Sequence, residues 1–367
     1  MKIGIDARLW SQSGVGRYTR NLVDQLQKID KKNEYVLFMG KQDADDFRAS
    51  LDNKQDSRFK VVEVDIKWHS LAEQLKFPKI LKKHNLDLVH FPYFSVPISY
   101  NRPYVVTIHD LIINHFSTGK ASTLNPFSYY IKRLGYFLTI SQSAKKARKV
   151  LTVSKATKKE IVSHLGLNED KIVTTYEGAD VLISSNSKRP IMYGRYFLYV
   201  GNAYPHKNLE RLIAAFENFK QQKIKLILVG PNDFFYKRLK KKIKNSNVIF
   251  LGTVSDSDLA NLYEHAVAFI SSSLMEGFGL PIVEAMTKKC SVVASDIPVF
   301  REITKNNAIF FDPYDKNDIY KKMDYVQENY SKLGRMRSDA FNESKKYSWT
   351  KMTKETLKVY EDCISLR

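Results

Sequence analysis

Short apolar runs that alternate with longer amphipathic stretches constrain the fold of this chain more than any other feature. The runs have the length of buried strands, and the stretches between them carry apolar residues at helical spacing. This alternation is typical of parallel α/β sheets. The expected strands are Lys2–Asp6, Tyr35–Met39, Val61–Val64, Leu86–Phe91, Val105–Ile108, Val150–Val153 and Ile172–Tyr176, then Phe197–Gly201, Leu226–Gly230, Val248–Leu251, Ala268–Ile270, Val292–Ala294 and Ile309–Phe311.

These strands form two successive sets, which predicts an α/β chain with two Rossmann-like, doubly wound parallel sheets. Such sheets bind ligands beyond the carboxyl ends of their strands. A polar stretch at Val181–Arg195, which contains Pro190, interrupts the periodicity and is the expected interdomain linker. Two intervening helices should each have one apolar face, formed by Tyr18, Leu22, Leu26 and Ile29 in the first and by Leu209, Leu212, Ile213, Phe216 and Phe219 in the second.

Length and charge agree with two domains and an anionic partner. A chain of 367 residues exceeds the usual size of one domain. Lys and Arg outnumber Asp and Glu by 59 to 39, which gives a net charge of +20. This balance favours phosphorylated substrates, acidic lipid or nucleic acid, although a solvated lysine-rich surface explains it equally well. Because no helix-turn-helix, ribonucleoprotein motif or zinc spacing is present, we expect no nucleic-acid partner.

Targeting and metal signals are missing from the sequence. Met1 and Lys2 lead directly into an apolar strand, so we expect no secretory leader. No apolar run approaches the roughly 18 residues that span a bilayer. Cys290 and Cys363 have neither metal-ligand spacing nor a disulfide framework. We therefore expect a cytosolic protein.

The most specific motif is EGFGLPIVE, from Glu276 to Glu284, which follows an expected strand and opens a helix. Gly277 and Gly279 allow close approach of a ligand to the backbone, and the amides of the following turn can bind phosphate. A carboxylate at Glu284 can accept hydrogen bonds from vicinal ribose hydroxyls. A plain strand–turn–helix corner with a glutamate favoured by the helix dipole explains the spacing equally well.

Five segments together resemble one protein family. EGFGLPIVEAM resembles the E-x7-E signature of the retaining family 4 glycosyltransferases, which have the GT-B fold. MKIGIDARLWSQSGVGRYTRNLV resembles their first strand, glycine loop and helix, and VTIHD resembles their histidine–aspartate turn. YVGNAYPHKNL resembles their phosphate-binding turn, and YSW resembles the approach to their last helix. These landmarks follow the family order along nearly the whole chain.

The resemblance implies two domains that face a central cleft, with the donor sugar bound between them. It implies an acceptor-binding domain over residues 1–185 and a nucleotide-sugar-binding domain over residues 190–345. Residues 346–367 would form a helix that crosses back to the first domain. In the first domain, the glycine loop with Gly14 and Gly16 would face the diphosphate, and His109 would contact the transferred sugar. Without the family, a helix-entry turn and a structural histidine are the more probable interpretations.

In the second domain, the resemblance assigns Lys207 to the donor phosphates, Glu276 to hydroxyls of the donor sugar and Glu284 to the ribose. His109, Lys207 and Glu276 are therefore the expected catalytic residues. The alternative for Lys207 is an exposed lysine at the start of a helix. The LGTV turn at Leu251–Val254 would contact the base, and its alternative is an ordinary strand end. The remaining donor-binding residues are Asn202, His206, Val254, Gly277, Phe278, Gly279, Leu280.

Two parts of the chain depart from the family pattern. Relatives often carry an arginine where this chain has Asn202 or His206, and a neutral histidine supplies less positive charge. More of the binding of the donor phosphates would then depend on Lys207, Arg17 and backbone amides. Where relatives often have Gly-x-Pro after the signature helix, this chain has Lys289-Cys290-Ser291, which affects only a turn.

Family membership implies a retaining, metal-independent transfer without a cofactor, in which the leaving phosphate takes the acceptor proton. The GIDAR and PHKNL segments resemble mannosyl- and rhamnosyl-type members, which favours GDP-mannose over a UDP-sugar as donor. The acceptor would be a glycan or a lipid-linked glycan in cell-surface polysaccharide assembly. The alternative is a catalytically inactive GT-B module that binds partners in a glycan-assembly complex.

One basic, aromatic segment raises the question of a membrane. Tyr129–Lys149 places aromatic and aliphatic residues beside lysines and arginines. This pattern suits contact with an anionic membrane surface on the inner face of the cell membrane. A core-facing helix followed by a basic turn explains the same residues and is the favoured interpretation.

Overall fold

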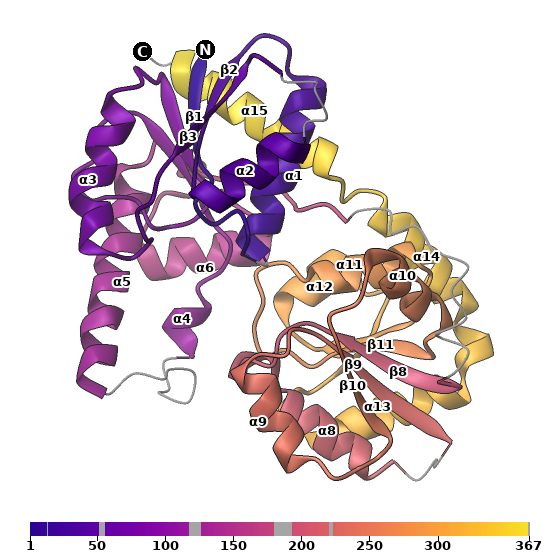
Figure 1. Cartoon of the computed structure of the whole chain (residues 1–367). Coiled ribbons are helices and arrows are strands. Elements are labelled where there is room, and N and C mark those ends of the chain that lie inside the picture. The colour runs from indigo at the N-terminus through magenta and orange to yellow at the C-terminus, as the bar shows by residue number, and fades with distance from the viewer. Residues whose placement is uncertain (13, 51–55, 117–125, 180–192, 220–222, 366–367) are drawn as a thin grey trace. The chain divides into compact units, whose positions relative to one another are not determined.

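The computed structural model describes residues 1–12, 14–50, 56–116, 126–179, 193–219 and 223–365 (Figure 1). The chain forms two compact units. The first comprises Met1–Leu111, Leu124–Glu177 and Trp349–Arg367, and the second comprises Ile112–Thr123 and Gly178–Ser348. Residues 181–192 of the expected linker lie outside the described residues, and Arg195 already begins a strand.

The first unit contains a parallel seven-stranded sheet with the strand order β3-β2-β1-β4-β5-β6-β7. The order reverses between β1 and β4, which is where doubly wound sheets bind ligands. The strands are β1 (Lys2–Asp6), β2 (Glu34–Met39), β3 (Phe59–Glu63), β4 (Leu88–Phe91), β5 (Tyr104–Ile108), β6 (Lys149–Thr152) and β7 (Ile172–Thr174).

The second unit contains a parallel six-stranded sheet with the order β10-β9-β8-β11-β12-β13, which reverses between β8 and β11. Its strands are β8 (Arg195–Val200), β9 (Ile224–Val229), β10 (Val248–Gly252), β11 (Ala268–Ser271), β12 (Val292–Ser295) and β13 (Ile309–Phe311). Each expected strand is present, with ends displaced by two residues or fewer. The prediction of two Rossmann-like sheets is therefore confirmed.

Helices cover both faces of the first sheet (Figure 1). Tyr18 of α1 and Tyr360 of α15 both pack on His90 of β4, whereas Phe77 of α3 packs on Phe38, which points to the opposite face. Ser70 and Ser154 accept backbone hydrogen bonds and so begin α3 and α6. The helices are α1 (Gly14–Ile29), α2 (Lys41–Ser50), α3 (Leu71–Lys82), α5 (Pro126–Lys146), α6 (Lys155–Leu165) and α15 (Trp349–Ser365).

The second sheet is also covered on both faces. The apolar face of α8 is buried as expected and packs with α13 in one cluster of core residues. Helix α11 packs between α10 and α14 (Figure 1). The helices of this unit are α4 (Ile112–His115), α8 (Leu209–Glu217), α9 (Phe234–Lys242), α10 (Asp256–His265), α11 (Leu280–Thr287), α12 (Pro298–Thr304), α13 (Lys316–Glu328) and α14 (Gly334–Ser344).

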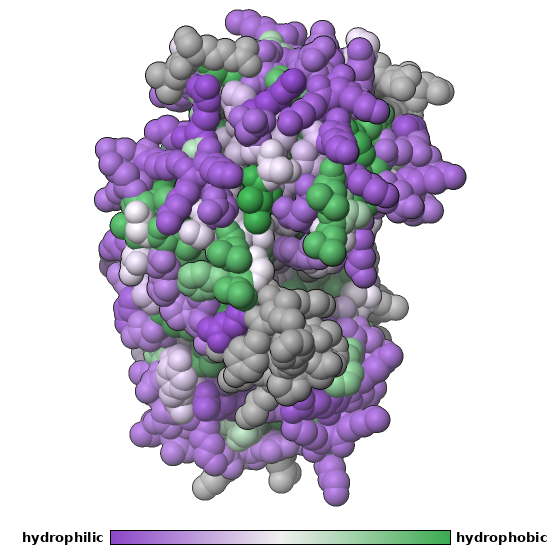
Figure 2. Space-filling model, turned by 90° about the vertical axis from the view of Figure 1, so that its left-hand side faces the viewer, coloured by the Kyte–Doolittle hydropathy of each residue, from purple (hydrophilic) through white to green (hydrophobic). Residues whose placement is uncertain are grey.

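Some large apolar side chains remain on the surface of the first unit. Figure 2 looks onto the side that carries α3 and α5, where hydrophobic areas interrupt a mainly hydrophilic surface. Leu71 is 82% exposed and Leu75 is 69% exposed, although both belong to α3. These side chains contribute nothing to the core of the sheet.

The last helix, α15, is joined to the first sheet by a buried polar chain. Tyr360 and His90 Nδ1 share a hydrogen bond of 2.5 Å, and His90 Nε2 bonds to the hydroxyl of Thr107 at 2.8 Å. Burial, together with the positive charge of His109, lowers the pKa of His90 to about 3. His90 is therefore neutral and holds α15 through uncharged hydrogen bonds.

We expect Tyr360→Phe to reduce the free energy of unfolding by about 1–3 kcal/mol, because it leaves a buried imidazole nitrogen without its partner. Urea denaturation of the two proteins measures this difference. Tyr325→Phe in α13 is the matched control, since Tyr325 is 49% exposed. An equal loss in both variants would contradict the structural role of the His90–Tyr360 bond.

Candidate active site

Two loops meet where the strand order of the second sheet reverses. One follows β8 and includes a 3-10 turn at Pro205–Lys207, and the other joins β11 to α11. The amide of Leu274 donates to the carbonyl of His206 at 2.7 Å, and the hydroxyl of Ser272 donates to the carbonyl of Lys207 at 2.8 Å. These bonds fix the phosphate-binding turn expected from the sequence against the start of the EGFG motif.

The centre of these loops is an ion pair between Lys207 and Glu276. Lys207 Nζ lies 2.5 Å from Glu276 Oε1, and the hydroxyl of Ser273 donates to the same oxygen at 2.7 Å. The two side chains are only 17% and 13% exposed. Burial by itself would raise the pKa of Glu276, but the positive charge of Lys207 and the hydrogen bonds from Lys207 and Ser273 lower it. The carboxylate is thus ionised and held in one orientation.

Asn202 and His206 flank this pair and carry no charge. Burial and the neighbouring ammonium of Lys207 lower the pKa of His206 to about 4, so its imidazole is neutral near pH 7. Asn202 Oδ1 accepts a hydrogen bond from the amide of Tyr204 at 3.2 Å. Lys207 therefore supplies the positive charge of this turn, which agrees with the reduced charge expected from the departures at residues 202 and 206.

The start of α11 requires glycine at residue 279. Gly279 has φ +102°, and a Cβ atom there would lie 2.9 Å from the Phe300 ring. The side chain of Phe278 is buried and packs edge-on against Tyr347. Phe278 can therefore offer only its backbone to a donor. The same holds for Gly277 and Gly279, which have no side chain. Leu280 begins the helix.

Glu284 and Val254 lie farther along their elements. Glu284 is 1% exposed in the second turn of α11, and the Tyr263 hydroxyl donates to its Oε2 at 3.0 Å. Val254 is half-buried just after β10, the edge strand of the sheet. Their contacts with a ribose and a base stay predictions.

In the first unit, His109 follows β5 and pairs with a carboxylate that the sequence analysis missed. His109 Nδ1 lies 3.2 Å from Glu177 Oε1, and Nε2 lies 2.9 Å from the carbonyl oxygen of Pro92. Burial opposes the charged imidazole, but Glu177 and the Pro92 carbonyl outweigh it and raise the pKa of His109. Because Glu177 follows β7 in the same parallel sheet, its position at a strand end was the available signal.

The glycine loop follows β1 at the same edge of the first sheet. A Cβ atom at Gly16 would lie 2.3 Å from the carbonyl oxygen of Trp10, so glycine is needed where α1 contacts the preceding loop. Nothing lies within 4 Å of a Cβ atom at Gly14. The requirement at Gly16 is thus steric, and contact of this loop with a diphosphate stays a prediction.

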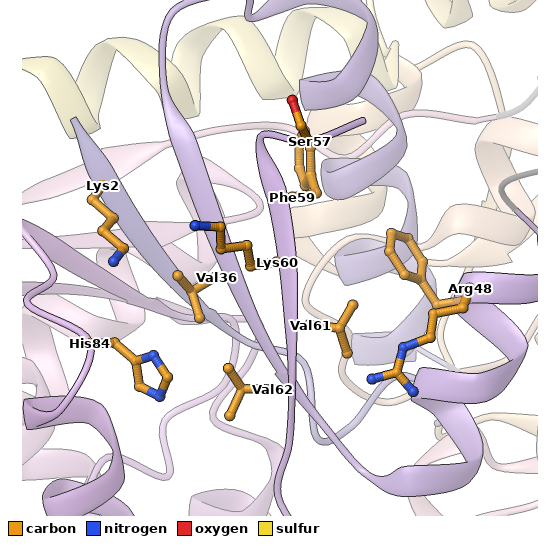
Figure 3. A pocket seen from close by; sticks show the side chains of 10 residues that line it. Lys2, Val36, Arg48, Ser57, Phe59, Lys60, Val61, Val62 and His84 are labelled. Carbon is orange, nitrogen blue, oxygen red and sulfur yellow. The ribbon is translucent and has the colours of Figure 1, made fainter. Parts of the chain in front are cut away.

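A pocket of about 540 Å³ lies elsewhere in the first unit. Its lining side chains stand on both sides of the edge strand β3, as Figure 3 shows. Lys2 and Lys60 belong to the amino-terminal halves of β1 and β3, away from the carboxyl ends that carry His109 and the glycine loop. This pocket is therefore separate from the candidate active site.

Two further properties concern only the described residues. No group of three or more His, Cys, Asp or Glu side chains there is arranged to hold a metal ion. None of the helices in that part of the chain combines the length and apolar character needed to cross a membrane.

The sequence of this chain is similar to those of known proteins. The family model "Glycosyltransferase Family 4" matches residues 12–181, and "Glycosyl transferases group 1" matches residues 184–343. The O-antigen chain mannosyltransferase RfbU of Salmonella typhimurium is 28% identical over 257 residues, with 68% of this chain and 67% of that protein covered. The O-antigen chain mannosyltransferase B of Escherichia coli is 26% identical, with 95% and 96% covered.

The fold also resembles that of HepE from Anabaena, whose crystal structure contains UDP and glucose. The TM-score is 0.77 at 18% identity, with 99% of this chain and 100% of that chain covered. Two doubly wound parallel sheets of this kind form the GT-B fold, which the structurally similar glycosyltransferase chains share. The two family models together span nearly the whole chain. The chain belongs to glycosyltransferase family 4.

The ion pair of His109 predicts a pH-dependent stability. The pKa of His109 in the folded state lies above about 6.5, the usual value for the unfolded chain. The stabilisation is therefore complete below about pH 6.5 and is lost as the pH rises through the folded pKa. We expect the free energy of unfolding of wild type to exceed that of Glu177→Gln by more at about pH 6 than at about pH 9.

Chemical denaturation at the two pH values measures this difference, and NMR titration of His109 follows its pKa directly. Glu63→Gln is the control, because the Glu63–Arg48 pair of the same unit is about two-fifths exposed. A difference between wild type and Glu177→Gln that is independent of pH would show that His109 is neutral.

Proposed function

We propose that the chain is a retaining, metal-independent hexosyltransferase. It transfers a sugar from a nucleotide diphosphate-sugar to a glycan or lipid-linked acceptor during assembly of a cell-surface polysaccharide. The observation that carries this proposal is the Lys207–Glu276 ion pair, held beside the start of α11 where the second sheet reverses its strand order. The names of the relatives, both O-antigen chain mannosyltransferases, support the sugar and the type of product.

The donor diphosphate would bind at the start of α11. Backbone amides at Gly277–Leu280 and the positive end of the helix dipole suit an anionic group. The ammonium of Lys207 lies beside this turn and would offset the charge that develops on the leaving diphosphate. Glu276, oriented by Ser273 and Lys207, would accept hydrogen bonds from hydroxyls of the donor sugar. Glu284 would do the same for the ribose.

The transfer needs no carboxylate nucleophile. The bond between the anomeric carbon and the phosphate oxygen breaks, and the acceptor oxygen attacks the same face of the sugar. The acceptor proton passes to the oxygen of the leaving phosphate. The enzyme contributes positioning and electrostatic stabilisation, and a charged His109 would contact the sugar from the first unit. A hydrolase-like acid–base pair of Glu276 and Glu284 is not part of this mechanism, because both carboxylates would accept hydrogen bonds from hydroxyls of the donor.

We propose GDP-mannose as the donor in preference to a UDP-sugar, a choice that the names of the relatives support. The protein would act in the cytoplasm, on the inner face of the cell membrane. An inactive GT-B module in a glycan-assembly complex is the competing function. Release of a nucleoside diphosphate from a donor sugar in a hydrolysis assay distinguishes the two, because an inactive module releases none.

We expect Lys207→Ala and Glu276→Gln each to reduce the rate of transfer by at least about a hundredfold, the scale of losing one preorganised electrostatic contact. The assay is donor turnover by purified protein. Lys288→Ala is the matched control, since it removes a lysine that pairs with Glu264 at 2.8 Å in the same unit. Near wild-type turnover in either site variant would refute the assignment.

Donor identity is tested by thermal-shift measurements with GDP, GDP-mannose, UDP and UDP-hexoses. A ligand at about 100 times its dissociation constant adds roughly 2.7 kcal/mol of stability. We expect GDP-mannose and GDP to raise the melting temperature most. A larger shift with UDP compounds would reject the GDP-mannose proposal and leave the transferase proposal intact.

A further inference from the structure

Two helices of the first unit expose apolar side chains in register with lysines. On α3, Leu71 and Leu75 are 82% and 69% exposed, and the same stripe continues to the exposed Lys79 and Lys82. On α5, Leu134 and Leu138 are 63% and 52% exposed, and the stripe continues to the exposed Lys145. Residues three or four apart share one side of a helix. On the described part of each helix, exposed leucines are thus followed along one side by exposed lysine.

The segment between β4 and β5 joins the two stripes. The Gln74 side chain of α3 accepts a hydrogen bond from the amide of Ile98 at 2.9 Å, and Lys146 of α5 donates to the carbonyl of Ile98 at 3.0 Å. Ile98 is itself 42% exposed. We call this surface the α3–α5 face, defined by Leu71, Leu75, Lys79 and Lys82 of α3, Ile98, and Leu134, Leu138 and Lys145 of α5.

The charge around the α3–α5 face has one sign. Residues 67–83 contain five lysines and one acidic residue, Glu73, which is buried and paired with Arg8 at 2.6 Å. Residues 133–149 contain five lysines and arginines and no acidic residue. A field of this kind attracts an anionic surface and is not neutralised by neighbouring carboxylates within these segments.

We propose that the α3–α5 face docks on an anionic phospholipid bilayer. Leucines of an amphipathic surface enter the boundary between headgroups and acyl chains, while lysines beside them stay with the anionic headgroups. The combination of exposed leucine and lysine on two joined helices fits this occupant. It suits a protein partner less, because the centre of a protein interface is depleted in charged residues.

This arrangement differs from the membrane contact considered from the sequence. From the sequence, Tyr129–Lys149 favours a core-facing helix followed by a basic turn, and the side chains of residues 126–132 lie outside the described part of the structure. Ile140 and Ala144 of α5 are buried, as expected of a core-facing helix, whereas Leu134 and Leu138 are exposed on another side of it. The partner stripe on α3 was not recognised. The docking itself does not rest on the proposed function. Only its purpose, access to a lipid-linked acceptor, does.

The test is co-sedimentation of the full chain with vesicles. We expect binding to vesicles of phosphatidylglycerol and phosphatidylcholine in equal parts, weakened by salt, and no binding to phosphatidylcholine alone. Lys79→Gln with Lys82→Gln should weaken binding at least about twentyfold, because each lysine near an anionic surface contributes about fivefold. Leu71→Ser with Leu75→Ser should weaken it at least about tenfold.

A matched control comes from the second unit. Phe234 of α9 is 58% exposed, and Lys240 and Lys241 of the same helix are exposed, so this helix also presents an aromatic residue and lysines. Phe234→Ser, and separately Lys240→Gln with Lys241→Gln, should leave vesicle binding unchanged. Circular dichroism checks that every variant is folded. Release of nucleoside diphosphate from donor sugar, measured without vesicles, should stay at the wild-type rate in all of them.

Three results would overturn the proposal. The first is no binding to anionic vesicles, as expected if the face docks another protein. The second is equal binding to vesicles of phosphatidylcholine alone. The third is loss of binding in the α9 variants and not in the α3 variants. Failure of the proposed function would look different, because vesicle binding would persist while no variant, nor wild type, released nucleoside diphosphate.

Discussion

The ion pair between Lys207 and Glu276 is the interaction on which the candidate site depends. A buried ion pair is a weak source of stability, because the desolvation of two charges offsets most of their attraction. Here, the carboxylate of Glu276 also accepts a hydrogen bond from the hydroxyl of Ser273. The hydroxyl of Ser272 donates to the carbonyl of Lys207 and so fixes its backbone. The surrounding loops therefore hold a lysine ammonium and a carboxylate in place at the reversal of the strand order. An apolar pair of the same size would serve the fold as well, so the charges suit a charged ligand.

The first sheet shows what decides whether a buried histidine is charged. His90 and His109 belong to adjacent parallel strands, β4 and the end of β5, and both are largely buried. His90 contacts only hydroxyl groups through its ring nitrogens, so burial prevails and its pKa falls to about 3. His109 contacts a carboxylate and a carbonyl oxygen, and its pKa rises. The chemistry of the partners, and not burial alone, sets the charge.

Much of the fold could be predicted from the sequence, because the apolar runs have the length of buried strands and their number follows directly. The Lys207–Glu276 contact could not be predicted as a pair, because the two residues are 69 positions apart and only the adjacency of β8 and β11 brings their loops together. Glu177 was missed for the same reason. A strand end marks a position at the functional edge, but it does not say which side chains at that edge meet.

The exposed leucines illustrate a different limit. In α3, Phe77 and Leu81 are buried, whereas Leu71 and Leu75 are exposed, so apolar residues lie on both sides of the helix. Periodicity within the helix cannot then tell which side faces the sheet. Contacts from outside the helix settle the question, since Phe77 packs on Phe38 of β2. Residues that look like core in the sequence can thus be surface once the sheet is in place.

The distribution of charge separates long-range attraction from chemistry. Cations at the functional edges are paired locally: Lys207 with Glu276, His109 with Glu177, and Arg8 with Asp6 and Glu73. These pairs leave little net charge in place, so the excess of +20 must lie mainly on solvent-facing surfaces such as the lysines of α3, α5 and α9. Salt screens such exposed charges over about 10 Å at ordinary ionic strength. The surface charge can therefore govern how the protein approaches an anionic partner, while the paired groups at the strand ends act only on a ligand already in contact.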